Sequence, residues 1–269
     1  MSNILVVDNT GAVSNTQQRC EYSVIGFRTI WSDSAYTGQA EDPLYPFANT
    51  LDFPDNTKYS PLASSGTVVI EISQGALTEI DYFGMSIHNA QSAGLNAKLE
   101  HWNGASWDLL TEFTSLQDDK PYMSVFSPVQ SRKQRLTLTF TSKLYIGTMF
   151  CGKALTALST PSLGFQPAKY GIQDEVEQFT TEGNQTVMGR RIPRGWQAKG
   201  SFDYVPLTVL DTFYVEYQNW VLDSKPIFFK WSNLKDEVMF GRQNVDRLTK
   251  PKYKTAYHAD IDFEINGIQ

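Results

Sequence analysis

The sequence predicts a mainly β protein of two domains, and three observations carry this prediction. Short runs of alternating apolar and polar residues recur between turn signals over residues 24–155, the pattern of an antiparallel sandwich. Residues 186–231 have the pattern of a hairpin, an amphipathic helix and a strand, in that order. Residues 257–266 alternate apolar and polar side chains without interruption, which indicates a half-buried final strand.

The expected strands of the first domain place apolar side chains at every second position. These side chains are Val68, Ile70 and Ile72; Phe83, Met85 and Ile87; Leu95, Ala97 and Leu99; Leu136, Leu138 and Phe140; and Leu144, Ile146 and Phe150. Residues 32–61, rich in Pro, Asp and Asn, predict a long loop, and loops of that length are functional or disordered in most domains. Its acids, Asp33, Asp42, Asp52 and Asp55, suit calcium ligation or plain solvation, and their scattered spacing favours solvation.

The second domain is expected to begin with a hairpin. Residues 186–192 and 196–204 predict its two strands, and Pro193, Arg194 and Gly195 predict the turn between them. Apolar residues at helical spacing predict a helix after Pro206, and the apolar run at 226–231 predicts the next strand.

The expected division is an arm at residues 1–23, a sandwich at 24–155 and a β-rich domain at 156–269, with a linker at 159–165. The arm is expected because its polar composition offers too little apolar surface to repay ordering. A chain of 269 residues is long enough for two domains of ordinary size.

Composition and charge exclude several classes of function. A net charge of −6 gives no basic surface for phosphates, so no specific nucleic-acid binding is expected. Cys20 and Cys151 lack the paired spacing of a zinc or redox site and are expected to be free thiols. No apolar run approaches the ~18 residues of a membrane span and no signal peptide is visible, so a soluble protein without membrane insertion is expected.

Catalysis is not expected either. His88, His101 and His258 lie on or beside predicted strands, and no spacing supplies them with a nucleophile or a metal partner. No hydrolase, kinase or dinucleotide-binding motif is present. We therefore expect no enzyme activity, no cofactor and no metal.

The segment from Trp102 to Trp107 is the sharpest candidate for binding. Two tryptophans around an Asn-Gly turn are suited to stacking on sugar rings. The alternative is that Asn103 and Gly104 form a hairpin turn while both tryptophans pack inside the sandwich, and the pattern favours this alternative.

The first domain resembles the galactose-binding-like jelly-roll family. The residues that carry the resemblance are Thr29, Trp31, Ser32, Asp33, Ile80, Phe83, Gly84, Ile87, His88, Asn89, Trp102, Asn103, Gly104, Trp107, Ile146, Gly147, Gly152 and Leu155. The resemblance implies loops at one end that hold sugars, lipids or proteins, and many members bind none of these. The candidate ligand-binding residues are Trp31, Asp33, His88, Asn89, Trp102 and Trp107.

The second domain resembles the distal tail or tail-tip structural proteins of bacteriophages with long non-contractile tails. The matching residues are Ile146, Gly147, Gly152, Ala154, Leu155, Pro161, Gly189, Arg190, Pro226, Phe228, Phe229, Trp231, Val238, Ile265, Gly267 and Ile268. The resemblance implies a ring-forming tail domain in the virion, made in the host cytoplasm. Its expected partners are further copies of the chain, tube, hub or fibre proteins of the tail, and a host surface glycan.

Two sets of charged residues were candidates for a role in such a ring. Arg190, Arg191 and Arg194 are candidates for assembly, with a solvated basic turn as the alternative. The polar face of the last strand is a candidate lining for a lumen, with an ordinary outer surface favoured instead; this face carries His258, Asp260, Asp262 and Glu264.

The expected function is therefore a structural ring component of a bacteriophage tail. The alternative from another class is a carbohydrate-binding module of a surface or secreted protein. A phage-borne glycan hydrolase is disfavoured, because the acid and nucleophile pattern is missing.

Overall fold

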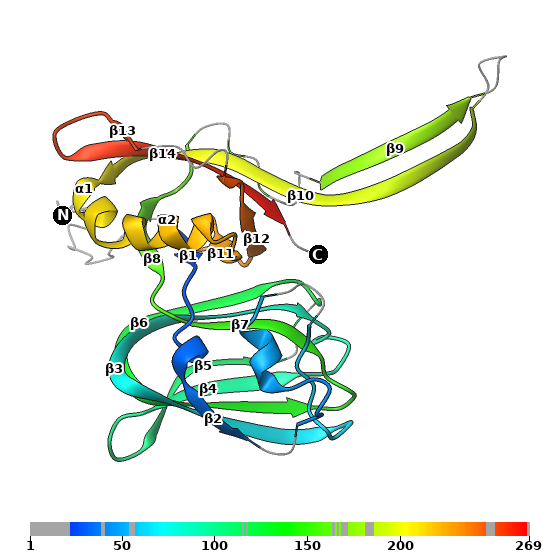
Figure 1. Ribbon diagram of the computed structural model, residues 1–269, viewed down its shortest axis with the longest axis vertical. Helices are drawn as coiled ribbons and strands as arrows, with labels where there is room; N and C mark the ends of the chain where they lie inside the picture. Colours follow the sequence, from blue (N-terminus) through cyan, green and yellow to red (C-terminus); the bar gives the residue numbers. More distant parts are fainter. Residues whose placement is uncertain are drawn as a thin grey trace, which may run out of the picture.

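The computed structural model describes residues 22–38, 41–53, 57–114, 116, 118–162, 165, 167, 172–180, 186–245 and 251–267. The described chain is mainly β, as the sequence predicts, and it forms two stacked lobes (Figure 1). The lower lobe in Figure 1 is a jelly roll of curled antiparallel strands. The upper lobe is a second antiparallel sheet with a helical segment against it and a long two-stranded ribbon that projects from it.

The jelly roll is built around two long, bent strands. The strands are β2 (Ala35–Gly38), β3 (Gly66–His88), β4 (Asn96–Trp102), β5 (Trp107–Thr114), β6 (Tyr122–Phe140) and β7 (Ile146–Gly152). They hydrogen-bond in the order β2-β3-β6-β4-β5, and β7 pairs with the second half of β3. Register shifts between Ser73 and Thr78 bend β3, so its two halves serve opposite sides of one closed core. The 3₁₀ turns η1 (Trp31–Asp33) and η2 (Phe47–Thr50) contribute Trp31 and Phe47 to that core.

The second domain is a sheet drawn from both ends of the chain. Its strands are β1 (Tyr22–Gly26), β8 (Leu155–Ser159), β9 (Ile172–Thr180), β10 (Thr186–Pro206), β11 (Ile227–Lys230), β12 (Met239–Gln243), β13 (Lys252–Tyr253) and β14 (His258–Gly267). The order is β8-β1-β11-β12-β14-β10-β9, and β13 pairs with β14. The predicted helix is present as α1 (Leu207–Val209), the π-helical turn η4 (Leu210–Tyr214) and α2 (Val215–Leu222). Its buried face includes Tyr217 and Val221.

The structure moves the expected domain boundaries. Val24 pairs with Lys230 of β11, and Tyr22 pairs with Ser159 of β8, so β1 belongs to the second domain. The jelly roll is therefore inserted between β1 and β8, and the segment expected to be a linker begins inside β8. The five residues of β1 do not show which sheet the strand joins, because a strand's partners are not encoded in its own pattern.

The predicted turn at Pro193–Gly195 is also wrong. These residues lie within the single long strand β10, where a register shift between Pro193 and Trp196 absorbs them as a bulge. The pairing of β9 with β10 instead begins at Thr180 and Thr186, and residues 181–185 lie outside the described residues. Arg190, Arg191 and Arg194 therefore lie along the projecting ribbon of β9 and β10 (Figure 1).

The two domains share an aromatic cluster centred on Phe150 of β7. The Phe150 ring lies 5.3 Å from Phe228, 5.9 Å from Trp220 and 5.2 Å from Phe53, all edge to face. The opposite face of β7 contributes Met149 and Cys151 to the jelly-roll core, so β7 is buried along its whole length. The domains approach so closely that a Cβ on Gly84 would lie 2.9 Å from the ring of Phe228, which explains a glycine there.

We expect Phe150→Ala to lower the free energy of unfolding by about 3–5 kcal/mol, since it leaves a cavity among the rings of Phe53, Trp220 and Phe228. We also expect calorimetry to resolve two thermal transitions, because the coupling between the domains is lost. Phe113→Ala is the control: Phe113 packs on Phe83 and Tyr122 inside the jelly roll and should preserve a single transition. A single transition at the wild-type midpoint in Phe150→Ala would contradict the coupling.

Candidate functional site

The hairpin between β4 and β5 holds its two tryptophans side by side. Trp102 and Trp107 are direct cross-strand partners, and their rings lie 5.5 Å apart at 64°. The turn between them is the predicted Asn-Gly turn, and Gly104 has a φ of +105° that other residues rarely adopt. The Asn103 side-chain oxygen accepts hydrogen bonds from the backbone N–H groups of Ala105 and Ser106, both at 2.8 Å. The turn is therefore fixed by its own side chain.

Both tryptophans lie at the surface and not in the sandwich core. Each is half-buried, and each packs against the other on the outer face of the sheet. The core side of the same strands is filled by Ala97, Leu99 and Phe113 instead. The alternative that the sequence favoured is therefore confirmed for the turn and wrong for the rings.

An ion cluster centred on the buried Glu100 of β4, with Lys98 of β4 and Arg135 of β6, supports the ring of Trp107. The Arg135 guanidinium carbon lies 4.5 Å from the centre of that ring, a cation–π distance. Two guanidinium nitrogens contact the same carboxylate oxygen of Glu100, at 2.9 and 2.8 Å, and the Lys98 ammonium lies 2.7 Å from its other oxygen. Burial alone would raise the pKa of Glu100, but the hydrogen bonds from Lys98 and Arg135 outweigh burial and lower it.

Sequence reasoning did not find Lys98, Glu100 and Arg135. Arg135 reaches Trp107 because β6 and β5 flank β4, and Glu100 is the cross-strand partner of Arg135 in that register. The alternation of β4 and β6 indicates that these three side chains share a polar face. Only the pairing of β4 with β6 brings them together under the tryptophans.

The hairpin offers the chemistry of an open stacking surface. The two rings present apolar area, and Leu109 on the same face of β5 is 53% exposed. Asp108 and Ser106 supply hydrogen-bonding oxygens at the turn, where Asn103 Nδ2 donates to both at 2.7 and 3.0 Å. Aromatic faces beside hydrogen-bonding groups can bind a ligand that is apolar on one side and polar at its edge.

The other predicted ligand residues do not join this site. Trp31 is 1% exposed and packs against Phe47 and Phe83 in the jelly-roll core. Asp33 lies in the same turn as Trp31, η1. His88 is 8% exposed, with Nδ1 accepting a hydrogen bond from the Ala90 N–H at 3.2 Å.

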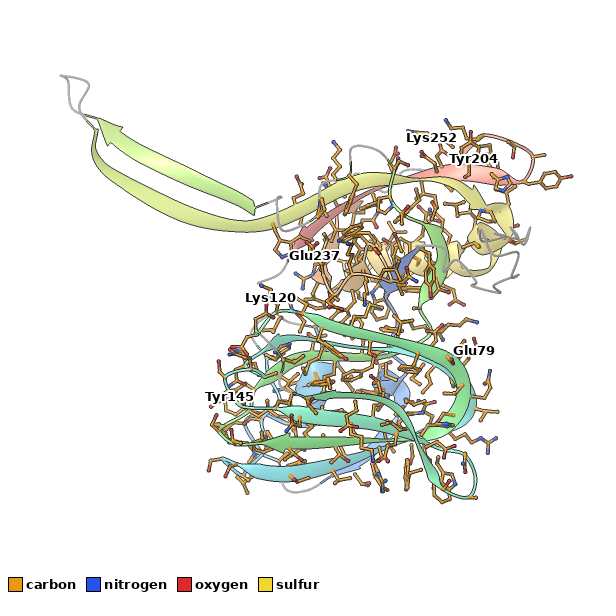
Figure 2. The ribbon with its side chains drawn as sticks, turned by 180° about the vertical axis from the view of Figure 1, so that it is seen from behind. Glu79, Lys120, Tyr145, Tyr204, Glu237 and Lys252 are labelled. Atoms are coloured by element: carbon orange, nitrogen blue, oxygen red, sulfur yellow. The ribbon has the colours of Figure 1, made fainter. Side chains whose placement is uncertain are left out.

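Asn89 has a structural role in the loops at one end of the jelly roll. Its side chain donates to the Lys143 carbonyl at 2.9 Å and accepts from the Tyr145 N–H at 2.7 Å. Strand β4 starts beside these loops and ends at Trp102, and its seven residues span roughly 20 Å. Figure 2 shows Tyr145 at one end of the jelly roll and Glu79 at the other. The six predicted ligand residues are therefore not one site.

The polar face of β14 differs from the open acidic row that the sequence suggested. Asp260 and Glu264 are 9% and 7% exposed. Lys254 lies 3.0 Å from Asp260 and Lys252 lies 2.7 Å from Asp262, while Asn244 and Gln197 donate to Glu264. Lys254 thus neutralises Asp260 and two amides cover Glu264, so the expectation of a wet, repulsive row is wrong for these two residues.

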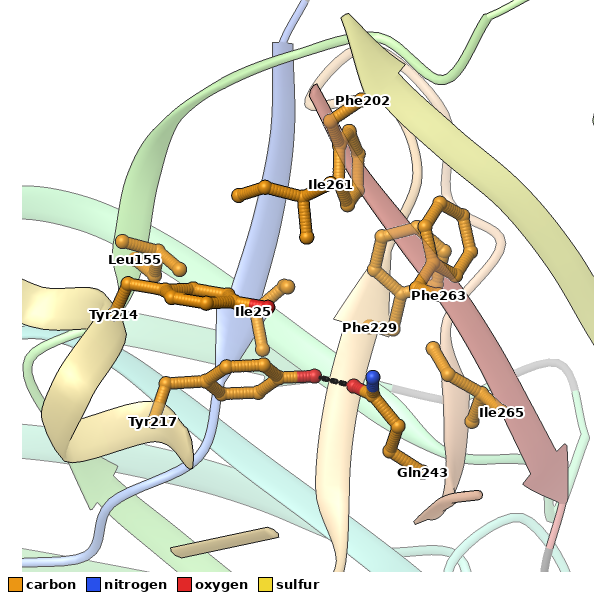
Figure 3. A pocket seen from close by; sticks show the side chains of 10 residues that line it. All are labelled: Ile25, Leu155, Phe202, Tyr214, Tyr217, Phe229, Gln243, Ile261, Phe263 and Ile265. Carbon is orange, nitrogen blue, oxygen red and sulfur yellow. Dashed lines mark hydrogen bonds between the residues drawn. The ribbon is translucent and has the colours of Figure 1, made fainter. Parts of the chain in front are cut away.

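A small cavity in the second domain is too small to be a ligand site. Its volume is about 10 Å³, against roughly 300 Å³ or more for a small-molecule pocket. Ile25, Phe229 and Phe263 are among the residues that line it, and Tyr217 donates a hydrogen bond to Gln243 at its edge (Figure 3). It is a gap in the core of the second domain.

Within the described ranges, no three His, Cys, Asp or Glu side chains gather in a way that would hold a metal ion. In the same part of the chain, no helix has the length and apolar character needed to cross a membrane.

No protein-family model and no curated protein matches the chain. Among solved structures, a fucosidase from Ruminococcus gnavus in complex with fucose is 20% identical, with a TM-score of 0.39, and the match covers 45% of this chain and 25% of that chain. A carbohydrate-binding module from Clostridium perfringens in complex with GalNAc-β-1,3-galactose is 12% identical, with a TM-score of 0.40, covering 47% of this chain and 100% of that chain. A pectin-binding carbohydrate-binding module is 17% identical, with a TM-score of 0.37, and the match covers 44% of this chain and 89% of that chain. This chain spans about a quarter of the fucosidase, and each likeness concerns the fold alone.

The expected function as a phage tail component is corrected by these comparisons. The matching structures are carbohydrate-binding modules and fucosidases, and none of these is a tail protein. The hairpin, helix and strand order that suggested a tail protein describes how a β domain packs, and one packing serves many functions. The expected tail partners and virion location depended on that assignment and lose their basis with it. The same holds for the assembly role of Arg190, Arg191 and Arg194 and for the lumen role of His258, Asp260, Asp262 and Glu264.

Two buried titratable groups in the jelly roll respond to acid in opposite directions. Asp81 is 5% exposed, and desolvation raises its pKa from 3.8 to about 6, although it accepts the Ala154 N–H at 2.7 Å. Desolvation lowers the pKa of His88 from 6.5 to about 4. As the pH falls from 6.5 to 4, the folded state gains stability, because Asp81 takes up its proton at a higher pH in the folded chain than in the unfolded chain. Over the same range it loses stability because only the unfolded chain protonates His88.

We therefore expect the two effects, each on the order of 3 kcal/mol, to offset one another in the wild type. In Asp81→Asn only the His88 effect remains, so the free energy of unfolding should fall as the pH is lowered from 6.5 to 4.5. In His88→Asn only the Asp81 effect remains, so the free energy of unfolding should rise over the same change in pH. Urea unfolding at both pH values measures this, and both amides retain an acceptor for the backbone N–H. Equal pH dependence in all three proteins would refute the assignment.

Proposed function

We propose that the chain is a non-catalytic carbohydrate-binding protein that holds a saccharide against Trp102 and Trp107. The observation that carries the proposal is the half-buried tryptophan pair at the surface, with the rings at 64° on the outer face of the jelly roll. A pyranose ring has an apolar face and a polar edge, and an aromatic ring beside hydrogen-bonding groups matches both. Asp108 and Ser106 supply such groups at the adjoining turn, and Lys98 lies on the same face of β4 as Trp102.

The ion cluster supports binding as the role of this hairpin, and not turnover. Glu100 stays ionised between Lys98 and Arg135, so it has no proton to give to a glycosidic oxygen. A glycosidase needs one carboxyl group that is protonated at working pH. The cluster instead holds the Arg135 guanidinium against one face of Trp107 and fixes that ring in place.

The charges on the outer face beside the hairpin balance, which favours an uncharged sugar. Glu71 and Glu112 are exposed on the same face, as cross-strand partners of Arg135 and Lys98. With Glu100 they are three carboxylates, and the cations Lys98, Lys133 and Arg135 on the same face match them in number. This face therefore has no excess charge to attract an acidic or a basic saccharide, whereas a neutral one needs none.

We expect Trp102→Ala and Trp107→Ala each to weaken binding of neutral hexasaccharides of glucose, N-acetylglucosamine or galactose about tenfold, or roughly 1.4 kcal/mol. A glycan array selects the sugar and calorimetry measures its affinity. Leu44→Ala is the control, since Leu44 is 79% exposed on a loop of the same domain, before β3. Tryptophan variants that bind like wild type would exclude this hairpin as the site.

A further inference from the structure

Tyr204 of the second domain combines exposure with a strained backbone. It lies in the bulge of β10 between Phe202 and Val205, and its φ is +55°. This left-handed region is unfavourable for a bulky residue, and a residue stays in it only where contacts with its neighbours hold the backbone there. The side chain is 63% exposed, so the strain is not compensated by burial of the ring. The bulge turns an aromatic side chain out to solvent.

A buried carboxylate holds Tyr204 in this conformation. The Tyr204 N–H donates to Asp260 Oδ1 at 3.2 Å, and Lys254 lies 3.0 Å from Asp260 Oδ2. Desolvation opposes ionisation of Asp260, but the hydrogen bonds from Lys254 and Tyr204 outweigh it and lower the pKa. The acceptor therefore stays charged and the strained geometry stays in place at neutral pH.

Polar groups lie around the exposed ring, and the two lysines among them are paired with carboxylates. The ring of His258 lies 6.2 Å from that of Tyr204 at 69°, and its Nδ1 is 3.2 Å from the Thr255 hydroxyl. Lys254 pairs with Asp260, and Lys252 pairs with Asp262 at 2.7 Å. Figure 2 shows Tyr204 and Lys252 together at the end of the second domain, away from the jelly roll. The surface offers two rings at an open angle beside hydrogen-bonding groups.

We infer that Tyr204 and His258 form a second saccharide-binding surface, for a neutral sugar. The ligand class rests on the proposed function, because the arrangement repeats that of the β4–β5 hairpin. In both places an aromatic pair at an open angle is held by a buried carboxylate that a cation neutralises. The centre of a protein interface would be more apolar than this ring of paired charges.

Two surfaces on one chain give a polysaccharide two points of attachment. The Phe150 cluster couples the domains, so the distance between the hairpin and Tyr204 is fixed. Once one surface is occupied, the second binding event becomes intramolecular, which strengthens binding to a long chain without new contacts. Short sugars would fill the surfaces separately.

Calorimetry with the same neutral hexasaccharides tests this in the full chain. We expect two molecules per wild-type chain, and one molecule after Tyr204→Gly or after the double change Trp102→Ala and Trp107→Ala. Tyr204→Gly removes the ring and relieves the left-handed φ, so its midpoint of thermal unfolding should equal or exceed that of wild type. Tyr204→Phe keeps the ring and should still bind two hexasaccharide molecules per chain. Tyr253→Ala is the control, because Tyr253 is 74% exposed but pairs with Ala259 and so points to the other face of the sheet.

The outcomes separate the two proposals. One molecule per chain, lost in the tryptophan variant and unchanged in Tyr204→Gly, overturns the second surface and supports the hairpin. One molecule lost only in Tyr204→Gly overturns the hairpin and supports the second surface. No binding by any hexasaccharide overturns both.

Discussion

The burial of β7 on both faces is the constraint on which the architecture depends. One face of the strand completes the jelly-roll core, and the other places Phe150 among the rings of Phe228, Trp220 and Phe53. A movement of β7 that suits one domain would expose apolar core residues of the other domain. Close approach at Gly84 follows from the same contact, because Phe228 lies where a side chain would otherwise be. The two lobes are therefore one mechanical unit with separate outer surfaces.

The exposed aromatic side chains depend on a second device, the neutralised buried carboxylate. An exposed ring has little packing to fix its orientation, so hydrogen bonds must do so. Glu100 orients Arg135 against Trp107, and Asp260 fixes the backbone of Tyr204. A buried carboxylate without a cation would be costly, which explains why Lys98 and Lys254 accompany them. Preorganised rings lose little entropy when a ligand arrives.

Local patterns predicted the elements, and non-local pairing decided where they went. Alternation identified β4, β6 and β14, and the Asn103-Gly104 pair identified a turn, because side-chain period and φ preference are local properties. The sequence did not reveal that β1 joins the second sheet, because its partner strand, which contains Lys230, is about 200 residues away. It did not reveal the contact of Arg135 with Trp107 either, because the two residues lie on different strands. Pro193 suggested a turn because proline interrupts most strands, but a bulge accommodates it here.

The insertion of the jelly roll between β1 and β8 imposes an order on folding. During synthesis β1 emerges first, yet its neighbour β11 is made only after the whole jelly roll and the ribbon. The jelly roll has its own core strands and can collapse while β1 is still unpaired. Closing the second sheet then depends on a contact between distant parts of the chain, which is the slow kind. Until that closure, Val24 and Ile25 on β1, and Phe150 on β7, remain exposed, and the nascent chain is at its most prone to aggregate.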